Sequence, residues 1–474
     1  MRYFTDAFSV ASSIKFEVRF IERFIKIWAS LILSSACFYL LDWILPSYQS
    51  RFYSLQFNYL ILFLIIYIYL NQIKVDTVRL NEHKYRVFFV ITTVVNLILA
   101  FKLFSNNYLL NTLDFQPHVN LINYIRVEGQ PLLGTTLNGI DGAFYPMGSL
   151  YFFASLSNLF NINVLIFLKY GYILTCAFFW PLVLWNYLKS FNISELSRCK
   201  IFIVALTLNQ MPFGYFYWGH WPTVQSILLT LFFEGSIFKN YRKINFRNGV
   251  FIFCFLVIIT AVHPVGLGTF FVLILIRKLF TFQFKISSFI SPKPINQIIA
   301  YVAVTLILLV TVLFNKNIFI QVNENWMKLI NGTTFIYKET LFERFVLFFY
   351  EWIINLKYTN NPIFDFLYFI LLILIVFFLC TIREKVILLI SVALVLSTAF
   401  AQQPFPYSLI AVPTFLFYSS PSRISHILII VVTLVLGAAF DRFRSSNRLI
   451  QFMYSVEMLT VYFIISNVLF YIKL

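Results

Sequence analysis

The sequence is poor in charged side chains, which make up 12% of its 474 residues. Soluble domains carry about 25% charged residues, whereas 60% of the residues here are hydrophobic. No stretch is polar enough to form a soluble domain of its own. An ordinary water-soluble fold is therefore excluded, and we expect residues 1–474 to form a single transmembrane domain.

Cysteine is scarce as well. The five cysteines are scattered, mostly inside apolar runs, and no C-x-x-C spacing occurs. This distribution argues against a disulfide framework or a zinc site, and buried packing is the better interpretation. The five are Cys37, Cys176, Cys199, Cys254 and Cys380.

The beginning of the chain lacks the small-x-small cleavage site of a signal peptide. Residues 1–26 are instead charged and amphipathic. We expect this segment to lie along the cytoplasmic membrane surface, in contact with anionic lipid.

Acidic residues are outnumbered by basic ones. The chain has 36 Lys and Arg against 19 Asp and Glu, a formal net charge of +17. In a soluble protein this excess would indicate nucleic acid, but cytoplasmic loops of a membrane protein are rich in Lys and Arg for topological reasons. We therefore expect membrane lipids as partners and no nucleic acid.

Long apolar runs are abundant, and a spanning helix needs about 20 mostly apolar residues. The pattern predicts an all-α fold: a polytopic transmembrane helix bundle with about thirteen spans. The predicted spans are 27–45, 56–73, 87–108, 163–188, 201–218, 223–238, 249–262, 265–280, 296–318, 362–382, 386–401, 425–441 and 452–472.

Basic loops orient these spans in the cell membrane. With the N-terminus cytoplasmic, every basic cluster falls on the cytoplasmic side, and the C-terminus lies outside. The clusters contain Lys74, Arg79, Lys84, Arg86, Lys189, Arg198, Lys200, Lys239, Arg242, Lys243, Arg247, Arg277, Lys278, Lys285, Lys293, Arg383, Lys385, Arg442, Arg444 and Arg448.

Two apolar stretches must then not cross the bilayer. Residues 147–160 and 407–418 are short and proline-flanked, which is typical of re-entrant or interfacial helices. Non-helical backbone at that depth is tolerated where it lines a wet cavity, so we expect a cavity that opens outward. Residues 319–361 include an amphipathic pattern and are predicted to form an outer interfacial segment.

A large outer loop, residues 109–162, contains candidate catalytic residues. Asp114 and His118 are four positions apart, so one helical turn would place both on the same face. A partly desolvated carboxylate at the end of a span is a candidate general base. A helix cap or a loop ion pair is the alternative.

Two further histidines precede prolines or aromatics at predicted outer turns. His263 lies before Pro264 between two apolar runs, where a structural turn and a functional histidine fit equally well. His220 has aromatic neighbours. They could stack on a sugar, although an interfacial aromatic belt explains them too.

Arg423 comes just before a predicted span, in the run FYSSPSRIS. An arginine so close to hydrocarbon is costly and usually marks a site or an ion pair. Its guanidinium can grip a phosphate with two parallel hydrogen bonds. Snorkelling to the interface is the alternative.

These residues together resemble the GT-C superfamily, polytopic glycosyltransferases that use polyprenyl-phosphate-linked sugars. The later motifs are similar to those of a group of uncharacterised bacterial membrane proteins with the same organisation. The matching residues are Asp114-x-x-x-His118, Gly129-Gln130-Pro131, Asn138, Tyr145-Pro146, His263-Pro264 and Tyr418-x-x-Pro421-x-Arg423.

The resemblance implies a reaction at the outer face. Asp114, with His118, would activate or position the acceptor hydroxyl, and Arg423 would hold the donor phosphate. The implied partners are a polyprenyl-phosphate-linked sugar donor and a glycan or lipid acceptor of the cell envelope. The remaining residues expected to bind substrate are Tyr145, Asp141, His220 and His263.

Two features depart from that family. The acidic residue follows the third predicted span rather than the first, and the loop has no Asp-x-Asp or Glu-x-Asp pair. We therefore predict no cofactor and no metal site, since dependence on a divalent metal has no support. The absence of a Gly-rich phosphate loop fits a donor that needs no nucleotide-binding domain.

Two alternatives stay open. A polysaccharide repeat-unit polymerase would also act on lipid-linked glycans, with Arg and His binding pyrophosphate and no need for Asp114. A transporter or lipid-glycan flippase predicts charges within spans, for which Lys102, Lys169 and Glu234 are candidates. Transporters are often built from repeats, and none is visible here.

Overall fold

The structure is a computed structural model, and every element in its described residues is a helix. No strand occurs in that part of the chain, which confirms the predicted all-α class. The described residues are 18–44, 52–72, 94, 97–98, 115–128, 148–175, 179–195, 197–198, 221–236, 246–281, 340–349, 369–370, 373–374, 376–400, 407–417 and 420–442.

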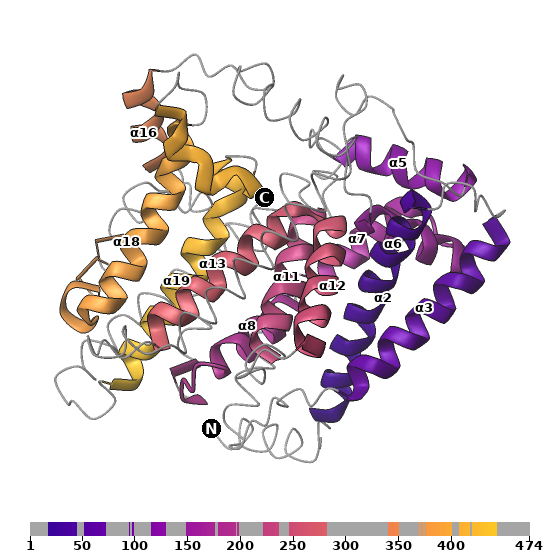
Figure 1. The fold of residues 1–474 in the computed structure, drawn as a ribbon, viewed down its shortest axis with the longest axis horizontal. Helices are drawn as coiled ribbons and strands as arrows, with labels where there is room; N and C mark the ends of the chain where they lie inside the picture. Colours follow the sequence, from indigo (N-terminus) through magenta and orange to yellow (C-terminus); the bar gives the residue numbers. More distant parts are fainter. Residues whose placement is uncertain are drawn as a thin grey trace.

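The helices are arranged across the molecule roughly in their sequence order, from α2 and α3 on one side to α18 and α19 on the other (Figure 1). In order they are α2 (Val18–Ile44), α3 (Phe52–Gln72), α5 (Phe115–Glu128), α6 (Gly148–Leu159), α7 (Val164–Leu174), α8 (Trp180–Lys189), α11 (Trp221–Ser236), α12 (Phe246–Val262), α13 (Pro264–Thr281), α16 (Leu341–Phe349), α18 (Ile382–Ser397), η7 (Thr398–Phe400), η8 (Tyr407–Phe417) and α19 (Pro421–Arg442).

Proline marks the start of four of these helices. Pro264 and Pro421 are the first residues of α13 and α19, and Pro181 and Pro222 are the second residues of α8 and α11. Proline is well placed there because its fixed φ angle suits a helix and the first turn needs no N–H donor. These prolines therefore set where the core helices begin.

A sharp turn separates α6 from α7, whose axes are bent by 118°. Asn161 has a φ of 50°, in the left-handed region that asparagine tolerates at a helix end. The Ile162 N–H donates to the Ser157 carbonyl at 2.9 Å and closes the end of α6. The stretch predicted to be re-entrant, residues 147–160, is thus a short helix followed by a tight reversal.

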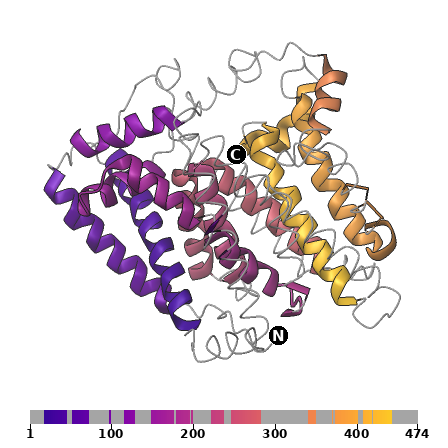
Figure 2. The same ribbon diagram turned by 180° about the vertical axis from the view of Figure 1, so that it is seen from behind.

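Helices α8, α11, α13 and α19 run in the same direction. Near their starts, Thr223 of α11 lies beside His263, and near their ends Glu234 of α11 bonds to Arg277 of α13. We call the two ends of the bundle the histidine end, with His263 and Arg423, and the ion-pair end, with the Glu234–Arg277 pair. Both views place α5 and α16 toward the histidine end (Figures 1 and 2).

Small residues let three helices approach closely at the histidine end. A Cβ atom on Gly148, the first residue of α6, would lie 2.9 Å from the Ala261 carbonyl oxygen of α12 and 3.0 Å from the Ala36 Cα of α2. Without a side chain at Gly148, the backbones of these helices can approach one another closely.

The bundle exposes apolar side chains and also buries polar ones within a mainly hydrophobic core. On α3, Leu60, Leu64, Ile65 and Ile68 are all exposed and form one stripe. In contrast, twenty-eight polar or charged residues of the described part are buried between the helices. Large contiguous apolar patches are unusual on soluble monomers, so this surface resembles one that faces lipid.

The predicted number of membrane spans can be compared with the structure only over the described residues. Among the described residues, one helix, Arg423–Arg442, is long and apolar enough to cross a membrane alone, and there are up to two if the bent pair α6–α7 forms a single span. The predicted count of about thirteen spans stays a prediction.

Candidate functional site

His118 lies on the inner face of α5. It is buried together with Val119, Ile122 and Ile125, and this three-to-four-residue spacing marks one side of a helix. That side packs on α6 and α7. The predicted general base, Asp114, directly precedes α5 in the sequence and lies outside the described residues.

His263 forms the junction between α12 and α13. Its Nδ1 accepts the Val265 N–H at 3.3 Å, so Nδ1 lacks a proton and Nε2 carries one. The Nε2 atom lies 3.4 Å from Thr223 Oγ1 on α11. Both ring nitrogens thus contact residues near helix starts, Val265 of α13 and Thr223 of α11. This geometry favours a structural turn over a functional histidine. A role in substrate binding stays a prediction.

Arg423 lies in the first turn of α19, half-buried, at the histidine end. That turn has no acidic residue, and the start of a helix already has a partial positive charge. The guanidinium and the helix start thus both contribute positive charge at this turn. The binding of a phosphate by Arg423 stays a prediction.

His118 and Arg423 lie at the same end of the bundle, but their helices do not pack on one another. Helix α5 packs on α6 and α7, whereas α19 packs on α13, α18 and η8. His263 lies closer to Arg423, because α13 and α19 pack on one another. The described residues thus bring His263 and Arg423 to neighbouring helices and leave His118 on the opposite flank.

Sequence reasoning missed His426, one turn after Arg423. It is fully buried, and its Nε2 lies 2.8 Å from Thr269 Oγ1 of α13. The signal was present in the run Arg423-Ile-Ser-His426, since residues three apart share a face of a helix. It was overlooked because the histidine falls inside a predicted span.

A polar stripe on α11 faces α13 along most of its length. The hydroxyl of Thr230 bonds to the Gly266 carbonyl of α13 at 3.1 Å. The stripe spacing of three or four residues keeps these side chains on one face. Its members are Thr223, Ser226, Thr230 and Glu234. Such seams hold membrane helices together through interhelical hydrogen bonds.

The stripe ends in a buried ion pair. Glu234 accepts two hydrogen bonds from the Arg277 guanidinium, one of them from Nη2 at 2.6 Å, and Nη2 also donates to Ser190 Oγ at 2.5 Å. The guanidinium lies 4.1 Å above the Phe191 ring. Arg277, which the prediction placed in a basic cluster at the end of span 265–280, lies in α13 and is a mostly buried partner of Glu234.

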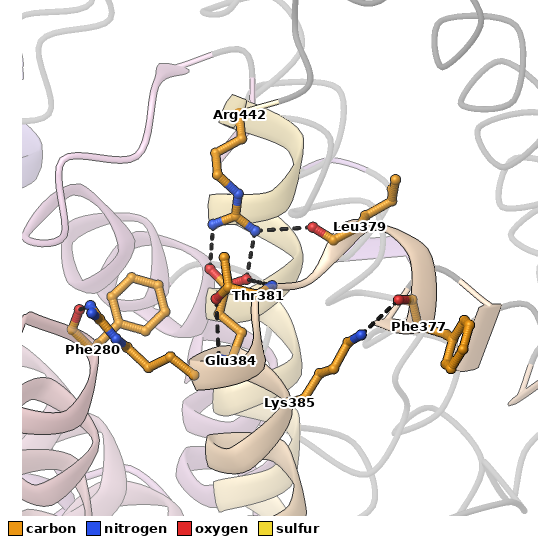
Figure 3. A network of polar contacts seen from close by, with 8 residues as sticks. Phe280, Phe377, Leu379, Thr381, Glu384, Lys385 and Arg442 are labelled. Atoms are coloured by element: carbon orange, nitrogen blue, oxygen red, sulfur yellow. Dashed lines mark hydrogen bonds and ion pairs between the residues drawn. The ribbon is translucent and has the colours of Figure 1, made fainter. Parts of the chain in front are cut away.

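A second ion pair ties α18 to α19 at the same end (Figure 3). Arg442 donates to both Glu384 carboxylate oxygens at 2.5 Å and to the Leu379 carbonyl at 3.1 Å. Glu384 also completes the capping box of α18 with Thr381. The carboxylate is therefore shared between a helix cap and a bridge between helices.

The outer interfacial prediction, residues 319–361, is described only at α16. This short helix buries Arg344 and Phe348 and exposes Phe342, Val346 and Leu347. The exposed residues thus include apolar side chains beside Glu343, and the buried ones include both an arginine and an aromatic ring.

Several predicted site residues lie outside the described residues. They are Asp114, Asp141, Tyr145 and His220. The transport candidate Lys102 also lies outside the described residues. In the described part, no group of three or more His, Cys, Asp or Glu side chains could hold a metal ion. The second transport candidate, Lys169, is partly exposed on α7.

Residues 70–452, most of the chain, match a family of unknown function, DUF6541, and the protein belongs to that family. No curated protein matches the sequence. No solved structure matches it either.

Proposed function

We propose that this protein is a membrane glycosyltransferase of the GT-C type. It moves a sugar from a polyprenyl-phosphate donor to a glycan or lipid acceptor of the cell envelope, at the outer face. Within that proposal Arg423 holds the donor phosphate, and Asp114 with His118 activates the acceptor hydroxyl. Tyr145, Asp141, His220 and His263 contribute to substrate binding.

Arg423 is the observation that carries the proposal. It is half-buried in the first turn of α19, a helix that packs on α13. A guanidinium and the positive starts of helices together stabilise an anion, and a phosphate at the end of a lipid would reach this depth without a nucleotide-binding domain.

The surface supports a place in the membrane. Apolar stripes on the outside and polar seams on the inside are the arrangement that lipid requires. Residues predicted on the cytoplasmic side lie at the ion-pair end. Lys189 is the last residue of α8, Arg383 donates to the Phe280 carbonyl near the end of α13, and Arg442 bonds to Glu384 (Figure 3). The histidine end would then face outward, where lipid-linked sugars are used.

The chemistry needs a base and a stabilised leaving group. The sugar–phosphate C–O bond breaks, the acceptor oxygen bonds to the sugar, and the acceptor proton passes to the base. Arg423 would stabilise the negative charge left on the polyprenyl phosphate.

The test is a transfer assay with purified protein in nanodiscs. Radiolabelled polyprenyl-phosphate sugars are supplied with lipid acceptors, and the release of polyprenyl phosphate is followed. We expect Asp114→Asn to lower transfer by about 10²–10⁴-fold with donor binding kept. Arg423→Ala should weaken donor binding by about tenfold or more, and Arg423→Lys should recover only part of it.

Lys278→Ala is the matched control, because this exposed cation lies near the other end of the bundle. It should leave both transfer and donor binding unchanged. Transfer that is undiminished in Asp114→Asn and Arg423→Ala would remove the proposed mechanism. Donor binding without Asp114 dependence would instead favour the polymerase.

A further inference from the structure

The buried histidine of α19 forms a link between two helices at the histidine end. His426 lies three residues after Arg423 and is fully buried. Its Nε2 atom lies 2.8 Å from the hydroxyl of Thr269, in the first half of α13. A buried polar side chain needs its hydrogen bonds satisfied.

The same ring bonds to the backbone of Arg423. The Arg423 N–H already donates to the Ser420 carbonyl at 3.1 Å, so the Arg423 carbonyl is the group left to accept from His426. A carbonyl can only accept, which assigns the donor role to the ring nitrogen that faces it. His426 thus connects the backbone of the Arg423 turn to α13.

The surroundings leave this turn little freedom. The Phe417 ring of η8 lies 5.9 Å from the His426 ring. A Cβ atom on Gly268 of α13 would approach the Phe417 ring to within 2.8 Å. Helix α13 and η8 therefore meet directly beside His426, and movement of the turn would require both to shift.

We propose that His426, together with Thr269, positions Arg423 for the phosphate of the lipid-linked donor. The inference rests on the proposed function, because it takes Arg423 as the phosphate-binding residue. His426 itself does not touch the phosphate. It acts through the turn that contains Arg423. The orientation of this turn determines whether the guanidinium can donate both hydrogen bonds to one phosphate.

Farnesyl phosphate is a suitable probe, with farnesol as the matched lipid that lacks the phosphate. Binding of both is measured to the full-length protein in nanodiscs, for the wild type, His426→Phe, Arg423→Ala and the double variant. We expect His426→Phe to weaken farnesyl phosphate binding by about tenfold. A guanidinium in another orientation would lose one of its two hydrogen bonds to the phosphate. Farnesol binding should not change.

The double variant separates positioning from packing. If His426 acts through Arg423, adding His426→Phe to Arg423→Ala should cause almost no further loss. An equal loss in both backgrounds, or equal losses for farnesol and farnesyl phosphate, would overturn the proposal. Where His426→Phe fails to fold, Thr269→Val is used instead. It removes one bond of the link, and a smaller loss of the same kind is expected.

Hydrogen exchange of residues 421–426 gives a measurement that needs no ligand. His426→Phe should speed exchange in this turn of α19 while exchange in α11 stays the same, and unchanged exchange would overturn the proposal. If wild-type protein binds farnesyl phosphate no better than farnesol, the proposed function fails, and the exchange result alone decides on the link. If it binds but transfers no sugar, the link stands and the reaction is wrong.

Discussion

The two ends of the bundle use arginine in opposite ways. At the ion-pair end, Arg277 and Arg442 are bonded to the buried carboxylates of Glu234 and Glu384. At the histidine end, Arg423 stands in a helix turn that has no acidic residue. A neutralised arginine joins helices, and a guanidinium in the first turn of a helix adds to the positive potential there. The comparison contrasts the two ion pairs with the residue that we propose for binding.

Removing one partner of the deeper pair should have the largest effect. In the Glu234–Arg277 pair the side chains are 0% and 14% exposed. Glu234→Met leaves a cation without its carboxylate, and we expect a loss of about 3–5 kcal/mol in unfolding free energy. The midpoint of SDS-induced unfolding measures it. The double variant Glu234→Met, Arg277→Met should recover most of this loss, and a double variant as unstable as the single one would contradict the argument.

The second-largest loss of stability is expected at a close contact between helix backbones. Gly148→Ala adds a methyl group 2.9 Å from the Ala261 oxygen, and such overpacking costs about 1–3 kcal/mol. Gly171→Ala is the matched control, because its Cβ would meet only the edge of the Phe153 ring, at 3.3 Å. Thermal unfolding in detergent should show a loss for Gly148→Ala alone. Equal midpoints for both variants would show that α6 can move away.

The shallower ion pair should matter less. Arg442 is 37% exposed and Glu384 is 4% exposed, so water weakens their attraction. We expect Arg442→Ala to lower the unfolding free energy by about 1–2 kcal/mol, between the values for exposed and buried pairs. The same SDS titration ranks it against Glu234→Met. A loss larger than that of Glu234→Met would mean that depth does not set the strength of these pairs.

The smallest effect is expected at the cap of α16. Glu343 accepts bonds from the Thr340 N–H at 2.8 Å and from its hydroxyl, and these bonds lower the pKa of the Glu343 carboxyl. A lowered pKa stabilises the folded form above the unfolded pKa of about 4.5, and this contribution is lost as the pH falls through the lower folded value. The protection of the Thr340 amide, corrected for intrinsic exchange, should therefore be high at neutral pH and lower in acid.

Glu343→Gln provides the comparison for that measurement. An amide oxygen can still accept the Thr340 N–H, but it does not ionise in this range. Protection at Thr340 should then no longer depend on pH, after correction for intrinsic exchange. A variant with the same pH dependence as the wild type would assign the change to another group.

Helix boundaries were the most predictable part of the fold. The predicted spans 249–262 and 265–280 correspond to α12 and α13, which the His263–Pro264 junction separates. Proline and long apolar runs leave a local signal in the sequence, so these elements follow without tertiary information. The all-helical class follows from composition for the same reason.

The partners of buried polar residues were not predictable. Glu234 stood out as a charge in a span, but nothing local indicates that Arg277 reaches it from another helix. His426 was hidden in the same way, since its bond to Thr269 joins residues 157 positions apart. Such pairs depend on how helices approach, and one sequence contains no direct signal of that approach.

The order of residues in the two ion pairs has a consequence for biosynthesis. Glu234 is made 43 residues before Arg277, and Glu384 is made 58 residues before Arg442. In a chain inserted into a membrane during translation, each carboxylate enters first and waits for its cation. A chain truncated between the two members of a pair would keep the buried carboxylate and lack its cation, so we expect such a fragment to be less stable than the finished segment.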